Sequence, residues 1–319
     1  MSVGDLVSLN LGSPVVLAFL LGVIAAFVKS DLRFPEQVTS LLSTYLLFAI
    51  GLKGGMRLRE SSLSELAWPV VITLVLGIAT PVVAFVVARS FLRLDTINAA
   101  ALAAHYGSVS AVTFTAAESF TRAAETLTEG YLPALVAVLE VPGIVVALVL
   151  ASRASHGRSM SSAIHEVLTG KSVVLLLGGI VIGAIANQEA LGRVEPFFIG
   201  LFQGLLCLFL LDLGTLAGQR FNSIRRAGVR LLMYATALPV VFGVAGVLLA
   251  SVAGMSEGGA TVLAAMAASA SYIAAPAAVR VGLPEADIGL SLGAALGVTF
   301  PFNLIIGIPL YSEIAALVA

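Results

Sequence analysis

The chain has 319 residues, of which 59% are hydrophobic and only 11% are charged, and its mean hydropathy is +1.05. Soluble domains contain about 25% charged residues, so this composition excludes an ordinary water-soluble protein. The net charge of −1 gives no basis for nucleic-acid binding. A lone cysteine, Cys207, excludes an intramolecular disulfide and a cysteine metal cluster. Long apolar runs rich in Leu, Ala, Val and Gly predict an all-α polytopic membrane protein surrounded by lipid.

Ten apolar runs approach the roughly 20 residues that a helix needs to cross a bilayer. We expect ten transmembrane helices at 14–29, 38–56, 67–89, 97–118, 131–152, 172–187, 197–216, 229–252, 258–279 and 287–311. The longest polar link, 152–171, lies at the midpoint of the chain. Within it, 161–170 can form a short amphipathic helix along the membrane surface.

Lys and Arg residues are distributed unevenly between the two sides of this arrangement. The loops after the first, third, fifth, seventh and ninth spans hold twelve of the 17 such residues, and the opposite side holds five. Short loops rich in Lys and Arg stay in the cytoplasm. We therefore expect a protein of the cell (inner) membrane with a cytoplasmic central link and both termini extracytoplasmic.

The two halves of the chain resemble each other at an offset of 161 residues. The matched pairs are Pro35 with Pro196, Ser108 with Ser269, and Ser110 with Ser271. Five spans per half is an odd number, so the second half must enter the membrane from the opposite side. This predicts a five-plus-five inverted repeat, as in secondary transporters, with repeats at 1–157 and 172–319 and a cytoplasmic link at 158–171.

Polar residues gather at equivalent positions of the fourth and ninth spans, in "GSVSAVT" (107–113) and "ASASYIAAP" (268–276). Gly107 lowers helix stability by about 1 kcal/mol relative to Ala, and Pro276 removes a backbone donor. We expect both helices to be discontinuous and to hold a small anion or zwitterion at their free N–H ends. The alternative is that these small residues only allow close helix packing.

At these residues the chain resembles the SbtA-type sodium-dependent bicarbonate transporters (permeases). The segments that carry the resemblance are "IGLKGGMRLRESSLSE" (50–65), "YGSVSAVTF" (106–114), "LEVPGIV" (139–145) and "AASASYIAAPAAVRVGLPEA" (267–286). The resemblance implies a core part that moves against a scaffold part, a homotrimer, and sodium-coupled bicarbonate uptake. It also implies that Ser110, Thr113 and Ser271 contact the anion, and it raises a cytoplasmic PII-like regulator as a possible partner.

The chain departs from the family pattern within the site. The family's Asp falls on Tyr272, and its Ser-Gly pair falls on Ala274 and Ala275. Taken together, the predicted substrate-binding residues are Gly107, Ser108, Ser110, Thr113, Ser269, Ser271, Ala274 and Ala275.

Ionisable residues inside a span usually face a cavity or a partner, and they are candidates for ion coupling. Glu140 matches the family's acidic position before Pro142; otherwise it would bond to the backbone that the proline frees. Asp212 is either functional or a solvated residue near a span end. His105 is either a proton-carrying group or a neutral ring bonded to a neighbouring helix. Tyr272 stands where the family has an acid and removes one candidate charge, and Asp212 is the residue that would restore one elsewhere. Sodium coupling is the first expectation, and proton coupling is the alternative.

Lys53 lies at the end of the second span, where the family has a small polar residue. We expect its side chain to extend to the membrane interface. A role in attracting anions is the second interpretation.

The leading hypothesis is secondary active transport of a small anion, bicarbonate first, by symport with sodium and alternating access. The alternative is a sodium- or proton-coupled transporter of another small organic anion, and a passive channel is a further one. An enzyme is not expected, because only three histidines occur and no nucleotide loop, metal motif or catalytic triad is apparent. No cofactor is expected, and sodium is the expected coupling ion.

Overall fold

The computed structural model describes residues 10–59, 62–151, 164–165 and 167–318, with the backbone alone at residue 63 and at 220–227. These residues form helices joined by short connections, and no strand is present among them. Most of the central link lies outside the described residues, and so does part of the amphipathic helix expected at 161–170.

Six of the helical segments are long and apolar enough to cross a membrane: Glu36–Leu58, Ser64–Ser90, Leu132–Ala151, Gln188–Gln219, Val229–Val252 and Ile288–Val318. Two further apolar helices, Pro14–Phe27 and Lys171–Ile185, are shorter. A soluble protein would have to hide these faces, yet many of their large apolar side chains are exposed, among them Leu21, Val86 and Val181. The protein is therefore an integral membrane protein.

The helices are α2 (Pro14–Phe27), α3 (Glu36–Leu58), α4 (Leu63–Ser90), α5 (Thr96–Gly107), α6 (Ala111–Ala123), α7 (Leu132–Ala151), α9 (Lys171–Ile185), α10 (Gln188–Glu195), α11 (Phe202–Ala227), α12 (Val229–Val252), α13 (Glu257–Ala267), α14 (Ala274–Gly282), α15 (Ile288–Ala294), α16 (Phe300–Phe302) and α17 (Ile308–Val318). Three π-helical turns, Pro196–Gly200, Ala295–Thr299 and Asn303–Gly307, connect helices within longer segments.

The seventh expected span is longer in the structure than its apolar run. The sequence predicted 197–216, whereas helical structure runs from Gln188 to Ala227. Asn187 begins it by accepting the N–H of Glu189 at 2.8 Å, and Pro196 is accommodated in a π-helical turn. The polar ends were missed because hydropathy records only the part of a helix that matches the bilayer.

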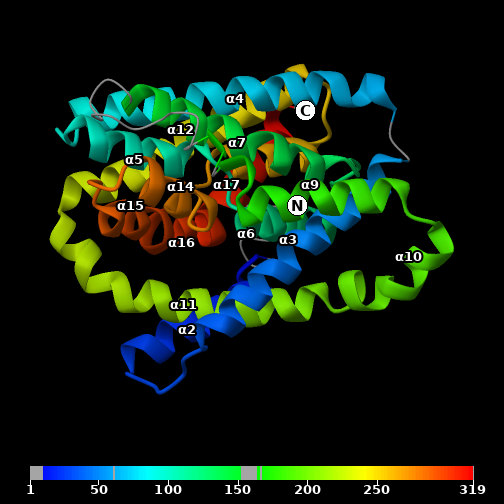
Figure 1. The fold of residues 1–319 in the computed structure, drawn as a ribbon, viewed down its shortest axis with the longest axis horizontal. Helices are drawn as coiled ribbons and strands as arrows, with labels where there is room; N and C mark the ends of the chain where they lie inside the picture. Colours follow the sequence, from blue (N-terminus) through cyan, green and yellow to red (C-terminus); the bar gives the residue numbers. More distant parts are fainter. Residues whose placement is uncertain (1–9, 60–61, 152–163, 166, 319) are drawn as a thin grey trace.

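Glycines bring one set of helices into close contact. In α2 and α11, a Cβ atom added to Gly22 or Gly214 would clash with the backbone of the other helix. Gly55 and Gly183 make the same kind of close backbone contact between α3 and α9. These four helices (the α2–α3–α9–α11 group) lie mainly on one side of the molecule, away from α4 (Figure 1). Small residues at such contacts let helix backbones approach.

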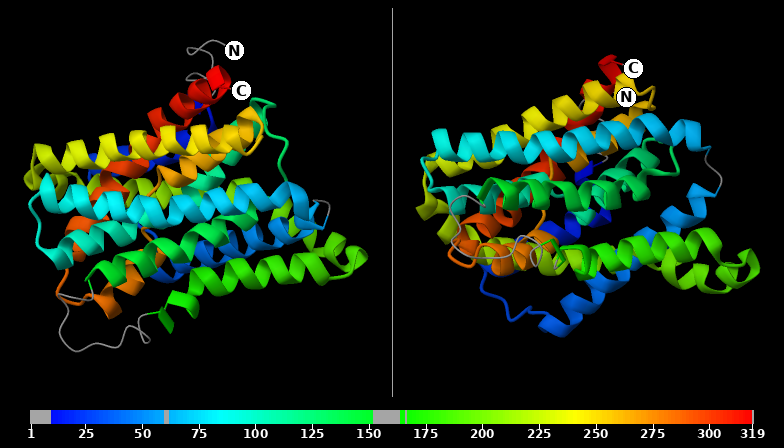
Figure 2. Two further views of the ribbon diagram at one scale, coloured as in Figure 1. Left: turned by 90° about the horizontal axis from the view of Figure 1, so that it is seen from above. Right: turned by 45° about the horizontal axis from the view of Figure 1, so that its top comes forward.

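Three long helices, α4, α7 and α12, and the 11-residue α17 surround α5 and α13 (the α4–α17 group). In Figure 2, α4 (cyan) and α12 (yellow) run side by side along the edge of this group. Residues 99–104 of α5 and 258–267 of α13 are all buried. Both helices are enclosed on all sides, which explains why alanine and glycine dominate them.

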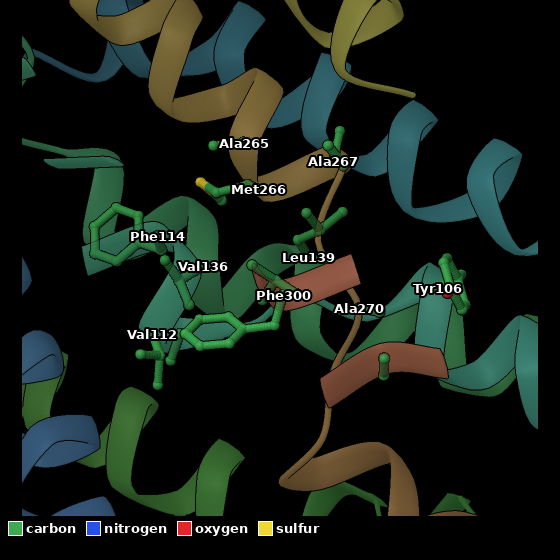
Figure 3. Close-up of a cluster of buried hydrophobic side chains, with 14 of the residues drawn as sticks. Tyr106, Val112, Phe114, Val136, Leu139, Ala265, Met266, Ala267, Ala270 and Phe300 are labelled. Carbon is green, nitrogen blue, oxygen red and sulfur yellow. The ribbon is translucent and has the colours of Figure 1, made fainter. Parts of the chain in front are cut away.

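The α4–α17 group has a buried apolar centre. Figure 3 shows Val112 and Phe114 of α6, Met266 of α13 and Phe300 converging there, next to Leu139 of α7. Phe300 and Phe114 are at most 2% exposed. At this centre α6 packs against α13, and α13 contacts α7. The non-helical residues beside α6 and α13 therefore lie inside the protein.

Replacing Gly183 with Ala should destabilise the protein, because the added Cβ would overlap the carbonyl oxygen of Leu52 on α3. Overpacking of this kind costs about 1–3 kcal/mol. Gly178 lies on the same helix with nothing near its Cβ position, so Gly178→Ala is the matched control. We expect thermal unfolding in detergent to show a lower Tm for Gly183→Ala only. Equal Tm values would contradict the close α3–α9 contact.

Candidate functional site

Two short non-helical segments lie where the serines recur. Residues 108–110 (the first break) separate α5 from α6, and residues 268–273 (the second break) separate α13 from α14. Ser108 and Ser110 have extended backbones. Each break exposes backbone groups that a continuous helix would pair internally, so these groups need other partners.

A serine closes the N-terminus of the helix after each break. Ser110 Oγ accepts the backbone N–H of Thr113 at 3.2 Å, and Ser271 Oγ accepts that of Ala275 at 3.2 Å. Serine is among the best residues for capping such N–H groups. The two serines are 161 positions apart in the sequence. Ser110 is the N-cap of α6, whereas Ser271 lies two residues before the N-cap of α14, Ile273, and reaches the N–H of Ala275 from there.

The two breaks cross and bond to each other. The N–H of Ser110 donates to Ser269 Oγ at 2.8 Å, and the N–H of Ser271 donates to the carbonyl oxygen of His105 at 2.7 Å. The carbonyl oxygen of Ser271 is 2.6 Å from His105 Nδ1. A carbonyl oxygen only accepts, so Nδ1 carries a proton. These three hydrogen bonds (the crossing) hold the ends of four helices together.

A small cavity adjoins the crossing. Its volume, counted as the space that the centre of a water molecule can occupy, is about 10 Å³. This is enough for about one water molecule. Ser110, Ser271 and Tyr272 of the two breaks line it, together with Glu140 of α7 and Ser172 of α9. The cavity therefore joins residues from both groups of helices.

Three buried polar atoms at or beside the crossing have no hydrogen-bond partner in the described part of the chain: His105 Nε2, Ser108 Oγ and Glu140 Oε2. The buried hydroxyl of Tyr272 faces Ser110. A buried polar group without a partner costs about 1–3 kcal/mol, and native structures contain few of them. Their concentration at one place marks it as a site at which polar ligands can bind.

The other predicted binding residues lie close to the breaks. Gly107 ends α5 against Gly143 of α7, where a Cβ on either residue would clash with the other backbone. Thr113 is in the first turn of α6, and Ala274 and Ala275 begin α14. The predicted substrate-binding residues thus lie in the breaks or within a few residues of them, and three of the four predicted coupling residues, His105, Glu140 and Tyr272, lie with them.

Asp212 is the predicted coupling residue that the structure does not bring to the crossing. Its Oδ2 accepts the hydroxyl of Thr39 at 2.6 Å, between α11 and α3. The residue is buried, with 3% exposure, so the interpretation as a solvated residue near a span end is wrong. Packing of α11 against α2 and α3 encloses this position, which hydropathy could not indicate.

The expectation that Lys53 extends to the membrane interface is also wrong. Its Nζ lies 2.8 Å from Glu118 Oε1, and Arg122 Nη2 lies 2.8 Å from the same oxygen. Sequence reasoning did not single out Glu118, although it ends the polar stretch of the fourth expected span. A basic residue within the second span was a signal that an acidic partner lies nearby in space.

Asn303 was missed as well. Its Nδ2 donates to the carbonyl oxygen of Ala268 at 2.8 Å, and its Oδ1 accepts the hydroxyl of Tyr311 at 2.9 Å. Ala268 directly follows α13, so Asn303 satisfies a carbonyl that the second break exposes. A single Asn within an apolar span was the available signal.

The model of the Na+-dependent bicarbonate transporter superfamily matches residues 14–316 of the chain. The match covers nearly the whole chain and includes both breaks, Glu140 and Lys53. The search of curated proteins found no match.

Replacing Ser269 with Ala should weaken the crossing, because the N–H of Ser110 would lose its acceptor in a buried place. The expected loss is about 1–3 kcal/mol of unfolding free energy. Ser90→Ala is the control: its exposed hydroxyl bonds only to Val86 in its own helix. Denaturation in detergent should separate the two variants. Equal stability would mean that this hydrogen bond contributes nothing.

Proposed function

The chain belongs to the Na+-dependent bicarbonate transporter superfamily, and we propose that it takes up bicarbonate by symport with sodium through alternating access. The crossing of the two breaks is the observation that carries this proposal. It brings two capped helix N-termini to one small cavity inside an otherwise apolar protein. Membership in this superfamily supports a transporter.

The chemistry of the crossing suits a small anion. The N-termini of α6 and α14 carry partial positive charge, and backbone N–H groups at such ends bind anions. Ser110 and Ser271 each accept one N–H, and a hydroxyl that accepts one bond still has a proton to donate. We propose that Ser110, Ser271 and Thr113 contact the anion, with Ser108, Ser269 and the backbone of Gly107, Ala274 and Ala275 beside it.

The narrowness of the cavity supports a closed conformation. About 10 Å³ of water-accessible space holds roughly one water, and bicarbonate has four heavy atoms. The anion must enter after the α4–α17 group, which holds the crossing, shifts against the α2–α3–α9–α11 group. Such a shift of a core part against a scaffold part is the movement that alternating access requires.

Pairing of the glycine contacts supports an inverted repeat of ten spans. α2 and α11 derive from the first and seventh expected spans, and α9 and α3 derive from the sixth and second. If each span is replaced by its equivalent in the other half, the α2–α11 contact becomes the α9–α3 contact. We propose that α5 with α6, and α13 with α14, are the discontinuous fourth and ninth spans, with repeats at 1–157 and 172–319.

Glu140 is the proposed coupling residue. Its Oε2 is buried without a partner among the described residues, and Ser172 and Tyr272 line the same cavity. A buried carboxylate needs a cation or a proton beside it. Sodium accepts carboxylate, hydroxyl and carbonyl oxygens, all of which are present here. Because Asp212 is engaged by Thr39 away from the cavity, we propose a structural role for it.

A proton-coupled transporter of another small organic anion is the second candidate. Tyr272 stands where the family has an acid, and its hydroxyl is buried beside Ser110. This change removes a negative charge from the cavity. The coupling site then has one carboxylate, Glu140, and a single carboxylate can bind a proton as well as sodium.

We propose insertion in the cell (inner) membrane with both termini extracytoplasmic and the central link cytoplasmic, from the distribution of Lys and Arg.

The homotrimer and the PII-like regulator stay predictions. Exposed apolar side chains on α4, such as Val75, Ile78 and Val86, suit either lipid or another subunit.

Ser271→Ala should weaken anion binding, because it removes a hydroxyl that faces the cavity and leaves Ala275 uncapped. We expect roughly a tenfold rise in KM for radiolabelled bicarbonate, the effect of about 1.4 kcal/mol, in vesicles with an inward sodium gradient. Ser110→Ala should behave alike, and Ser90→Ala should match the parent. Uptake that is unchanged in both variants, or absent from the parent under a sodium gradient, would contradict the proposal.

Glu140→Gln should uncouple uptake from its driving ion, since the amide cannot carry the negative charge that a cation requires. Uptake is measured in sodium and in choline media at several pH values. The sodium-stimulated part should fall about tenfold or more. Stimulation by a proton gradient instead of sodium in the parent would favour the second candidate. Full sodium stimulation in Glu140→Gln would exclude this residue from coupling.

A further inference from the structure

Helices α3 and α6 face each other along a row of residues that leads away from the crossing. On α3 the row is Leu47, Ile50, Lys53 and Arg57, and on α6 it is Ala111, Thr115, Glu118 and Arg122. Steps of three or four residues keep each row on one face of its helix. The two rows belong to different groups, because α3 packs mainly against α9 and α6 packs mainly against α13.

Three cavities follow these rows. The innermost adjoins the crossing and is lined by Leu47, Ser110 and Ala111. The next also contains Leu47 and Ala111, together with Ile50 and Thr115. The outermost measures about 540 Å³ and is lined by Arg57 and Arg122, with Glu129 and Tyr131 of the following loop.

The Lys53–Glu118 ion pair lies between the middle cavity and the outermost one. In sequence, Lys53 falls between Ile50 and Arg57, and Glu118 falls between Thr115 and Arg122. The side chain of Glu118 is 6% exposed, that of Lys53 is 24% exposed and that of Arg122 is 42% exposed. The exposed fraction of the side chains therefore falls sharply from Arg122 to Glu118. The ion pair separates the outer cavity from the space further inside.

The charges of this cluster suit passage of an anion. Within the ion pair's own cluster one carboxylate, Glu118, faces two cations, Lys53 and Arg122. The outer cavity adds Arg57, Glu65 and Glu129, so cations and carboxylates along the whole row are equal in number. Arg122 bonds to Glu118 within α6, whereas Lys53 bonds to it across the two groups. Glu118 can thus release Lys53 and keep a cationic partner. The released ammonium group would then face the passage.

We propose that the facing rows of α3 and α6 form the passage between the 540 Å³ cavity and the crossing, and that the Lys53–Glu118 ion pair is its gate. This inference rests on the proposed transport function. The gate opens when Lys53 leaves Glu118, and the released ammonium group then attracts an anion locally.

Cysteine labelling tests the gate without any substrate. Thr115→Cys places a thiol inside the gate, in a Cys207→Ser background that removes the native cysteine. A membrane-impermeant methanethiosulfonate ammonium reagent is applied to intact cells and to inside-out vesicles. Thr128→Cys, at an exposed position that lines the outer cavity, shows in the same way which side of the membrane that cavity faces.

Adding Lys53→Met should raise the labelling rate of Thr115→Cys from that side about tenfold, because the closed form loses its ion pair. Glu118→Gln should raise it too, and it serves as the second variant if Lys53→Met does not reach the membrane. Glu189→Gln is the control, since it removes an exposed pair with Arg193 in α10. A labelling rate that neither gate variant changes, or access only from the opposite side, would overturn the inference.

The labelling result and the transport result are independent. Faster labelling without bicarbonate uptake would retain the gate and remove the proposed substrate. Sodium-driven bicarbonate uptake with unchanged labelling would retain the function and remove the gate.

Discussion

The structure depends on how two interrupted helices satisfy their backbone groups away from water. Lipid offers no partner to a free N–H or carbonyl group, so each break must find its partners within the protein. The N–H of Ser110 finds Ser269 in the other break, and the N–H of Ser271 finds the carbonyl of His105. Each break therefore stabilises the other, and neither is expected to persist alone.

This mutual requirement explains the composition around the crossing. α5 and α13 must lie deep in the α4–α17 group so that their ends can meet, and twelve of their nineteen buried residues are alanine or glycine. Gly107 and Gly143 bring α5 and α7 into backbone contact, which places Glu140, three residues before Gly143, near the crossing. The small residues serve the packing role, and the proposed binding role at the same place is compatible with it.

Part of the site could be predicted from local signals in the sequence. The recurrence of Ser110 at Ser271 located both breaks, and hydropathy located the long helices. Pro276 was read as a helix breaker, yet it is the third residue of α14, where its missing N–H costs little. The break precedes it. A proline near a helix start and one that interrupts a helix look alike in a sequence without the capping residue.

Contacts between distant segments could not be predicted in this way. Glu118 and Lys53 are 65 positions apart, and Asp212 meets Thr39 across 173 positions. Each pairing depends on which helix faces turn toward each other, and hydropathy gives no information about this for helices buried on most sides. Ser172 reaches the cavity of Glu140 for the same reason, through the packing of α9 against α7.

The crossing and the Lys53–Glu118 pair differ in what happens when they are broken. Separating the two breaks would leave buried N–H and carbonyl groups without partners, at about 1–3 kcal/mol each. Separating Lys53 from Glu118 leaves Arg122 on the carboxylate, and the 540 Å³ cavity beside Arg122 can supply water to the ammonium group. An ion pair that can be rehydrated contributes little net stability. The crossing therefore suits a rigid unit, and the Lys53–Glu118 pair suits the proposed boundary between that unit and the α2–α3–α9–α11 group.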